Sequence, residues 1–210
     1  MKFSPAKFNK LLNGLAQSFL MKKGYACPCT TSSSGQPEVA CPVCSGKGRF
    51  WSSDIQGLAG VVSREQMKKQ VDLGLMDAGD IMLSIPSDSP LYAIGLYDRV
   101  ATVNKTEPFS QNFVYNVNDK LKFFPTQIDR VVWRDATTKA IVDGTIPTIN
   151  ADGTLTWTGT APPARATYSL TGRRYLEYFV YQDIPVDRPI HAGYTLPRRV
   201  ILRRFDLFGN

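Results

Sequence analysis

All four cysteines of this 210-residue chain lie in one short stretch between Tyr25 and Trp51. They form a C-x-C pair and, eleven residues later, a C-x-x-C pair: Cys27, Cys29, Cys41 and Cys44. Two close pairs on tight turns can bring four thiolates to the corners of a tetrahedron. Zn²⁺ prefers this geometry and these soft sulfur ligands. The spacing therefore predicts a small structural zinc knuckle that uses all four sulfurs.

Two disulfides are the alternative use of these cysteines, and four cysteines allow three pairings. A chain of this length can bury a core without disulfides, and no apolar run of signal-peptide length follows its start, MKFSPAKFNK. Zinc is therefore favoured, and disulfides stay open as the alternative. A catalytic zinc is disfavoured, because such a site keeps an open position and the only histidine, His191, is distant in sequence.

The second cysteine pair continues as Cys-Pro-Val-Cys-Ser-Gly-Lys-Gly. This stretch resembles one repeat of the cysteine-rich zinc region of DnaJ-type chaperones, C-x-x-C-x-G-x-G, over about eight residues. Glycines after such a pair can take positive φ and let the backbone fold under the sulfurs. The resemblance implies a zinc-binding turn and not membership of that family.

The net charge of the chain is +7 and is unevenly distributed. Residues 1–50 carry seven Lys/Arg against one acid, and residues 165–210 carry eight arginines against four acids. Basic ends indicate contact with phosphate or acidic protein surfaces, or simply solvated charges. The apolar fraction of 43% is that of an ordinary globular protein. No apolar run reaches the roughly eighteen residues that a membrane span needs, so no membrane partner is expected.

Residues 3–24 are predicted to form one amphipathic helix. Ser4 is a good N-cap, Pro5 suits the first helical position, and Gly24 would end the helix. Apolar side chains recur along it at helical spacing. This apolar face could pack on the chain's own core or dock onto another subunit. The candidate docking residues are Phe8, Leu12, Leu15 and Phe19.

Basic and aromatic residues are interleaved just after the last cysteine. Lys47 and Arg49 precede Phe50 and Trp51. Such interleaving beside a zinc turn could contact nucleic acid. The alternative is that the two aromatic rings form the hydrophobic floor of the knuckle.

Four arginines near the C-terminus form two adjacent pairs: Arg198, Arg199, Arg203 and Arg204. On a strand, the members of each pair point to opposite faces. One face could bind acidic neighbours, for which the planar guanidinium is well suited, and the other DNA or solvent. The alternative is a solvated edge strand that is protected by its charge.

The remainder of the chain reads as a β-rich body. Short strand patterns alternate with turn signals about every ten residues, and the segments 145–149 and 154–157 flank a glycine-containing turn that predicts a hairpin. The predicted fold is mainly β: an antiparallel β-sandwich or barrel with an N-terminal amphipathic helix and a small four-cysteine zinc knuckle. The predicted division places helix and knuckle in residues 1–54, and a β-rich body with an extended C-terminal arm in residues 55–210.

The sequence contains no recognisable catalytic arrangement. It has no Ser/His/Asp pattern, no phosphate-binding loop and no H-E-x-x-H motif. His191 stands alone between proline and glycine, and the carboxylates are scattered. We therefore expect no enzymatic activity, with a metal-dependent or thiol enzyme as the least favoured hypothesis.

Several segments resemble structural proteins of tailed bacteriophages. They are DGTLTW at 152–157, the aromatic YFVY at 178–181, and LPRRVILRR at 196–204, together with IPSDSPLY at 85–92 and YDRV at 97–100. Proteins of this kind belong to the head–tail connector, or neck. The short cysteine pairs near the N-terminus are similar to those of small neck and collar proteins.

This resemblance implies a β-rich subunit of a homo-oligomeric ring, in a virion that is assembled in the host cytoplasm. The ring would join the portal or an adaptor to tail or other neck proteins and would contact the genomic DNA that passes through it. It implies no catalytic residues. The N-terminal helix and C-terminal segment would be arms that reach neighbours, with the zinc knuckle as a brace. The alternative function is a nucleic-acid-binding zinc protein.

Overall fold

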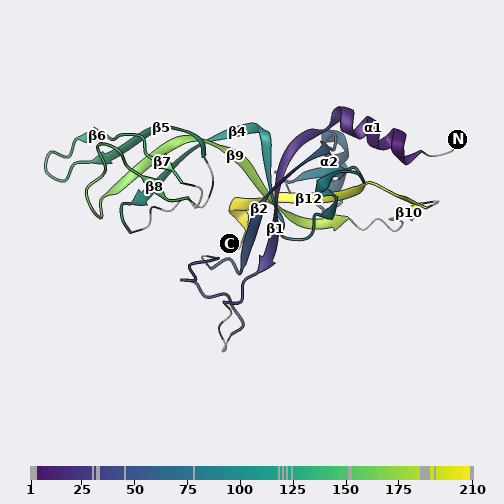
Figure 1. Ribbon diagram of the computed structural model, residues 1–210, viewed down its shortest axis with the longest axis horizontal. Helices are drawn as coiled ribbons and strands as arrows, with labels where there is room; N and C mark the ends of the chain where they lie inside the picture. The colour runs from purple at the N-terminus through teal and green to yellow at the C-terminus, as the bar shows by residue number, and fades with distance from the viewer. Residues whose placement is uncertain are drawn as a thin grey trace. The chain divides into compact units, whose positions relative to one another are not determined.

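The computed structural model separates the chain into two compact units (Figure 1). Unit 1 comprises residues 1–104 and 177–210, and unit 2 comprises residues 105–176. The division expected after residue 54 is not seen, because that residue lies within a continuous strand. The structure describes all residues except 1–3, 30, 32, 33, 45, 78, 118, 120, 122, 124, 151, 152, 185–189, 192, 209 and 210, and it leaves out the side chains of Pro5, Phe8 and His191.

Unit 1 is built on a closed antiparallel barrel. Its strands follow the order β12-β3-β2-β1-β4-β9, and β9 pairs again with β12, which closes the ring. Closure pairs both sides of the described strands, so the barrel needs no protection of exposed edges. The predicted mainly β, antiparallel fold is confirmed. The strands are β1 (Gln17–Ala26), β2 (Arg49–Val61), β3 (Ile81–Ile85), β4 (Arg99–Val114), β9 (Thr167–Ile184) and β12 (Arg198–Arg204).

The core of unit 1 is formed largely by apolar side chains of the barrel strands. Phe19 and Met21 of β1 lie two residues apart, so they point to the same face of the strand, and both are almost fully buried. Burial of each large apolar side chain contributes about 1.5–3 kcal/mol to stability. Other fully buried members of unit 1 are Met82, Leu83, Ile85, Leu91, Val100, Ile201 and Leu202.

The N-terminal helix is shorter than predicted. α1 spans Pro5–Leu15, and Gln17–Ala26 form β1, so the prediction of one helix over residues 3–24 is wrong for its C-terminal half. β1 pairs with β2 along its whole length and with β4 over part of it. These ladders, together with burial of Phe19 and Met21 on one face, outweigh the helical spacing of the same apolar residues.

The other helices of unit 1 are short. α2 (Arg64–Asp72) begins after Ser63, whose hydroxyl accepts a hydrogen bond from the backbone N–H of Gln66. Two 3₁₀ turns follow, η1 (Pro90–Ala93) and η2 (Phe205–Leu207). None of the helices within the described residues has the length and apolarity to cross a membrane.

The predicted C-terminal arm contains a two-strand ladder. β10 (Ile190–His191) pairs with β11 (Tyr194–Thr195) before the chain returns to the barrel in β12. The described side chains of Ile190 and Tyr194 are exposed. Residues 185–189, which join this ladder to β9, lie outside the described residues.

Unit 2 is a smaller β structure that contains the C-terminal part of β4 and the N-terminal part of β9. β9 pairs with β5 (Pro125–Arg134), which pairs with β6 (Ile141–Asp143). The hairpin predicted for 145–157 is confirmed as β7 (Thr148–Ile149) and β8 (Leu155–Thr156). The core of unit 2 is rich in aromatic residues and contains Phe109, Phe113, Leu121, Phe123, Ile128, Val131, Trp133, Tyr168 and Leu170.

Candidate metal centre

The four cysteines lie in the loop from Cys27 to Gly48, between β1 and β2, which we call the knuckle. The two strands are paired up to Ala26 and Arg49, so both ends of the loop are held side by side. The backbone N–H of Cys27 donates to the carbonyl of Gly48 at 2.9 Å and closes the base of the loop. Gly46 and Gly48 have φ values of +80° and +68°, which confirms the predicted role of these glycines.

Backbone hydrogen bonds fold the two cysteine turns onto each other. The N–H of Glu38 donates to the carbonyl of Cys29 at 2.8 Å, and the N–H of Cys41 donates to the carbonyl of Glu38 at 3.1 Å. In the second turn, the N–H of Lys47 donates to the carbonyl of Cys44 at 3.1 Å. Both pairs of thiols are therefore positioned by local turns, as the spacing requires.

The four Sγ atoms converge on one point. All of them lie within 4.8 Å of one another, and the closest contacts are Cys29–Cys44 at 3.3 Å and Cys27–Cys41 at 3.8 Å. A tetrahedron of sulfurs around Zn²⁺ at about 2.3 Å has edges of about 3.8 Å. Cys29 is half-buried and the other three are buried. The predicted ligand set is thus brought together and could hold a metal ion.

The surroundings of Cys41 favour the thiolate form of its side chain. Hydrogen bonds from the backbone of Cys44 and Val43 lower the pKa of the Cys41 thiol to about 7. The contact with Cys44, and then burial, raises the pKa of Cys29 to about 12. Burial raises the pKa of Cys27 as well. A bound cation would overcome these increases, because thiolates are stabilised by direct coordination.

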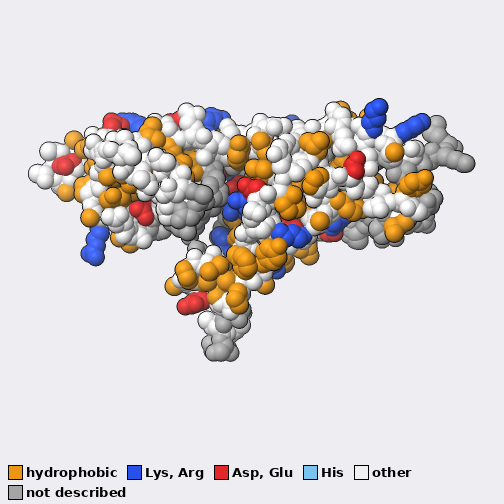
Figure 2. All heavy atoms as spheres, viewed as in Figure 1, with side chains coloured by type: hydrophobic (Ala, Val, Ile, Leu, Met, Phe, Trp, Pro, Cys, Tyr) orange, Lys and Arg blue, Asp and Glu red, His pale blue; other side chains and the backbone are white. Residues whose placement is uncertain are grey.

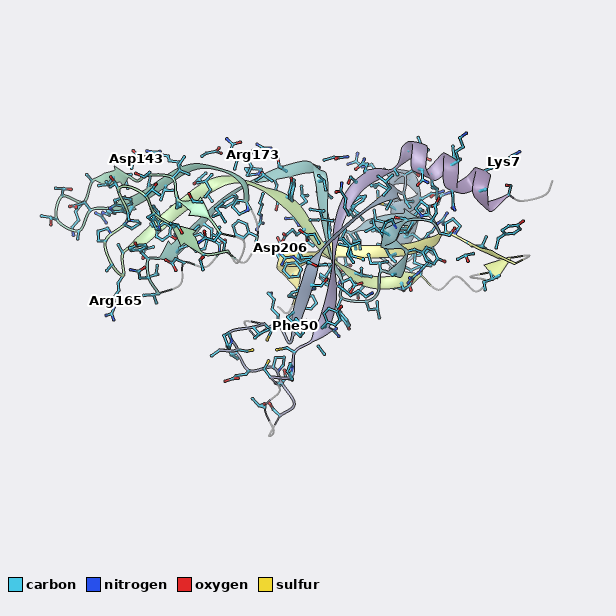
Figure 3. The ribbon with its side chains drawn as sticks, in the orientation of Figure 1. Lys7, Phe50, Asp143, Arg165, Arg173 and Asp206 are labelled. Atoms are coloured by element: carbon cyan, nitrogen blue, oxygen red, sulfur yellow. The ribbon has the colours of Figure 1, made fainter. Side chains whose placement is uncertain are left out.

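Part of the outer surface of the knuckle is apolar. Val39 is 87% exposed and Val43 is 63% exposed, and the rings of Tyr25 and Phe50 stack with centroids 5.6 Å apart. Figure 2 shows hydrophobic side chains gathered over this part of the molecule, and Figure 3 labels Phe50 beside the sulfur-bearing loop. The sulfurs therefore lie beneath a surface that can lose water on contact with another protein.

The basic residues that follow the last cysteine contact aromatic residues of the same chain. Lys47 Nζ donates to the carbonyl of Phe208 at 2.7 Å, and the guanidinium of Arg49 lies 4.0 Å from the ring centroid of Tyr97. Trp51 packs edge-on against Phe208 and its Nε1–H donates to the carbonyl of Tyr97 at 3.1 Å. These contacts attach the base of the knuckle to the barrel. The nucleic-acid role of Lys47 and Arg49 stays a prediction.

Most of the C-terminal arginines are bound by acidic residues of unit 1. Arg203 is the most enclosed: it lies 2.9 Å from the buried carboxylate of Asp80 and 3.7 Å from the ring centroid of Tyr181. Arg199 is exposed. The interface or DNA role of these arginines stays a prediction, but the described ion pairs already give three of them a structural role. Those pairs are Arg198–Asp183, Arg203–Asp77, Arg203–Asp80 and Arg204–Asp206.

The predicted docking residues separate into different environments. Leu15, at the end of α1, is 73% exposed, and Leu12 is half-buried. Phe19 is 0% exposed in the barrel and cannot contact another subunit while the barrel is folded. Its assignment to the docking face is therefore corrected. The side chain of Phe8 lies outside the described ones.

Sequence reasoning missed Asp98, which anchors the hairpin that carries the knuckle. Asp98 is 2% exposed. Its Oδ1 accepts from the N–H of Gly24, and its Oδ2 accepts from the N–H of Gly95 and from Lys23 Nζ, each at 2.8 Å. A Cβ at Gly24 would lie 2.8 Å from the carbonyl oxygen of Tyr97. The turn Gly-Leu-Tyr-Asp is visible in the sequence, but its partners on β1 are about 74 residues away.

We expect Asp98→Asn to lower the free energy of unfolding by about 2 kcal/mol, since hydrogen bonds to a buried charge are lost. Urea denaturation measures the change. Asp54→Asn is the matched control: its pair with Lys22 is 3.4 Å long and its side chain is 45% exposed, so we expect a loss below about 0.5 kcal/mol. Equal losses for the two variants would contradict the anchoring role.

Comparison with known proteins adds no family assignment. A scan against protein-family models and a search of curated proteins both find no match for this chain. The barrel and the four-cysteine knuckle are therefore the observations on which a proposal of function rests.

Proposed function

We propose that this chain is a structural subunit of the neck of a tailed-bacteriophage virion. Copies of it form a homo-oligomeric ring at the head–tail junction, between the portal or an adaptor and the tail, and the genome passes through this ring. The observation that carries the proposal is the β1–β2 hairpin. It extends from barrel strands into a four-cysteine knuckle that exposes the apolar side chains of Val39 and Val43.

The metal in the knuckle is Zn²⁺. Four thiolates complete a tetrahedral shell and leave no open position, which favours a structural ion over a catalytic one. Among the described residues of the knuckle, the buried cluster consists of the cysteines themselves. The ion therefore supplies the folding free energy that a loop of this size cannot obtain from apolar burial.

A ring subunit needs a rigid body and an element that reaches its neighbour. The closed barrel provides the first, and the metal-braced knuckle with exposed Val39 and Val43 provides the second. Leu11 and Leu15 of α1 are also exposed and offer a second apolar contact. Burial of such side chains between subunits stabilises an assembly by the same effect that stabilises the barrel.

The alternative of a nucleic-acid-binding zinc protein depends on Lys47 and Arg49. Both side chains contact aromatic residues of the same chain: Lys47 contacts Phe205 and Phe208, and Arg49 contacts Tyr97. No observation on the described residues therefore favours this alternative over the neck role. We likewise retain the expectation that the chain has no enzymatic activity.

Electron microscopy of the concentrated, zinc-loaded protein tests the proposal. We expect ring-shaped oligomers, and we expect Val39→Asp with Val43→Asp to convert them to smaller species, because a charge on the apolar face must be desolvated on assembly. Val117→Asp is the matched control, since Val117 is 65% exposed in unit 2, away from the knuckle in sequence. Monomers alone at high concentration, with no binding to portal or tail proteins, would overturn the proposal.

A further inference from the structure

The knuckle consists of two limbs, each with one cysteine pair. Cys27 and Cys29 lie on the limb that continues β1, and Cys41 and Cys44 lie on the limb that leads into β2. Each thiol contacts a thiol of the opposite limb, Cys29 with Cys44 at 3.3 Å and Cys27 with Cys41 at 3.8 Å. The sequence alone allows three disulfide pairings, and these contacts select one of them.

We propose that the knuckle is a thiol-oxidation site that closes as Cys29–Cys44 and Cys27–Cys41 when its metal is withdrawn and a peroxide is present. Both bonds join one limb to the other. They therefore tie the loop at the same place as the metal does. Pairing within each limb, Cys27–Cys29 and Cys41–Cys44, would leave the two limbs untied.

The first bond forms between Cys29 and Cys44, because their sulfurs are 3.3 Å apart and Cys29 is the least buried of the four thiols. One hydrogen peroxide molecule oxidises one thiol of this pair to a sulfenic acid and releases one water. The sulfur of the other thiol then attacks the sulfenic sulfur, and a second water leaves as the disulfide forms. In sum, two thiols and one peroxide give one disulfide and two waters. The sulfurs must approach by only about 1.3 Å to reach bonding distance.

The second bond consumes a second peroxide in the same way. Cys27 and Cys41 are both buried, so this step follows the first and needs local opening of the loop. The resulting crosslinks join residues that are 14 and 15 positions apart in the chain. This inference depends on the positions of the sulfurs and not on the neck role, so either proposal can fail without the other.

The pairing can be read from two protease cuts on the full-length protein. The metal is removed with a chelator, hydrogen peroxide is added, and remaining thiols are alkylated. Trypsin cleaves after Lys23 and Lys47, and a glutamate-specific protease cleaves after Glu38, which separates the limbs. We expect peptides 24–38 and 39–47 to remain linked until a reductant is added. Separate peptides with internal disulfides, or sulfinic and sulfonic acids without any disulfide, would overturn the proposal.

Serine variants distinguish the two possible crosswise pairings. Cys27→Ser with Cys41→Ser keeps the pair at 3.3 Å, and Cys27→Ser with Cys44→Ser keeps Cys29 but removes its partner. Each variant loses two of the four proposed metal ligands, so the two variants are matched in metal loss. We expect the first to form its disulfide at least about tenfold faster, because its thiols are held in contact. Equal rates, or a faster second variant, would contradict the proposed pairing.

Discussion

Replacement of Cys41 by serine is expected to remove zinc from the knuckle while the barrel stays folded. The buried Cys41 sulfur is one of four converging sulfurs, and a structural zinc site with three thiolates loses the closed shell that holds the ion. Elemental analysis should show a fall from one zinc per chain to almost none. Limited proteolysis should then cleave within the knuckle, and assembly into rings should be impaired.

The stability of the barrel should change little when zinc is lost from the knuckle. Its core residues, among them Val100, Ile201 and Leu202, are not part of the cysteine cluster. We expect the melting temperature to fall by less than about 3 °C, which corresponds to roughly 1 kcal/mol for a chain of this size. Ser34→Ala, at an exposed position of the same loop, is the control and should keep its zinc. Unfolding of the whole chain by Cys41→Ser would show that the knuckle belongs to the main core, and full zinc retention would exclude Cys41 as a ligand.

Phe19→Ala is expected to destabilise the protein by about 3–5 kcal/mol, since it leaves a large cavity in a packed core. Phe19 is fully buried on β1, where it faces the inside of unit 1. Leu15→Ala, four residues earlier, should change stability by no more than about 0.5 kcal/mol, because the side chain is exposed at the end of α1. Urea denaturation of both variants measures the difference.

The same two variants separate folding from assembly. In the structure, only Leu15 of this pair is available for contact with another subunit. We expect Leu15→Ala to weaken oligomers without affecting the fold of the monomer. Unchanged stability of Phe19→Ala, combined with loss of assembly, would mean that Phe19 is on the surface and that the helix continues past residue 15.

The four-cysteine cluster could be predicted from the sequence because it is local. Two turns of the knuckle place the cysteine pairs, and the hydrogen bonds that join Glu38 to Cys29 and Cys41 span no more than about ten residues. Gly46 and Gly48 were recognisable for the same reason, since a positive φ is a property of the residue and its immediate neighbours. The β content was predictable from the density of strand and turn signals.

The start of β1 could not be predicted in this way. Apolar residues between positions 8 and 20 fit a helical stripe, and only the ladders with β2 and β4 decide that Gln17 begins a strand. A backbone segment takes the conformation in which its hydrogen bonds and its apolar face are both satisfied. For β1, both kinds of partner lie far along the chain.

The roles of the polar residues Asp98 and Arg203 could not be predicted from the local sequence either. Asp98 binds the backbone of β1, and Arg203 binds Asp80, which is 123 positions away. Nothing in the local sequence distinguishes these residues from solvated surface charges. The arginine pairs therefore suggested a surface role, whereas the fold places acidic partners beside three of the four.

The sequence by itself thus determined the four cysteines of the knuckle, the turns that place them and the β character of the chain, because each depends on residues close together along the chain. The tertiary structure decided the closure of the barrel through β9 and β12, the conversion of Gln17–Ala26 into a strand, and the attachment of the knuckle to Phe208 and Tyr97. It also decided which thiol lies against which. These features depend on contacts between distant residues, and such contacts exist only once the chain has folded.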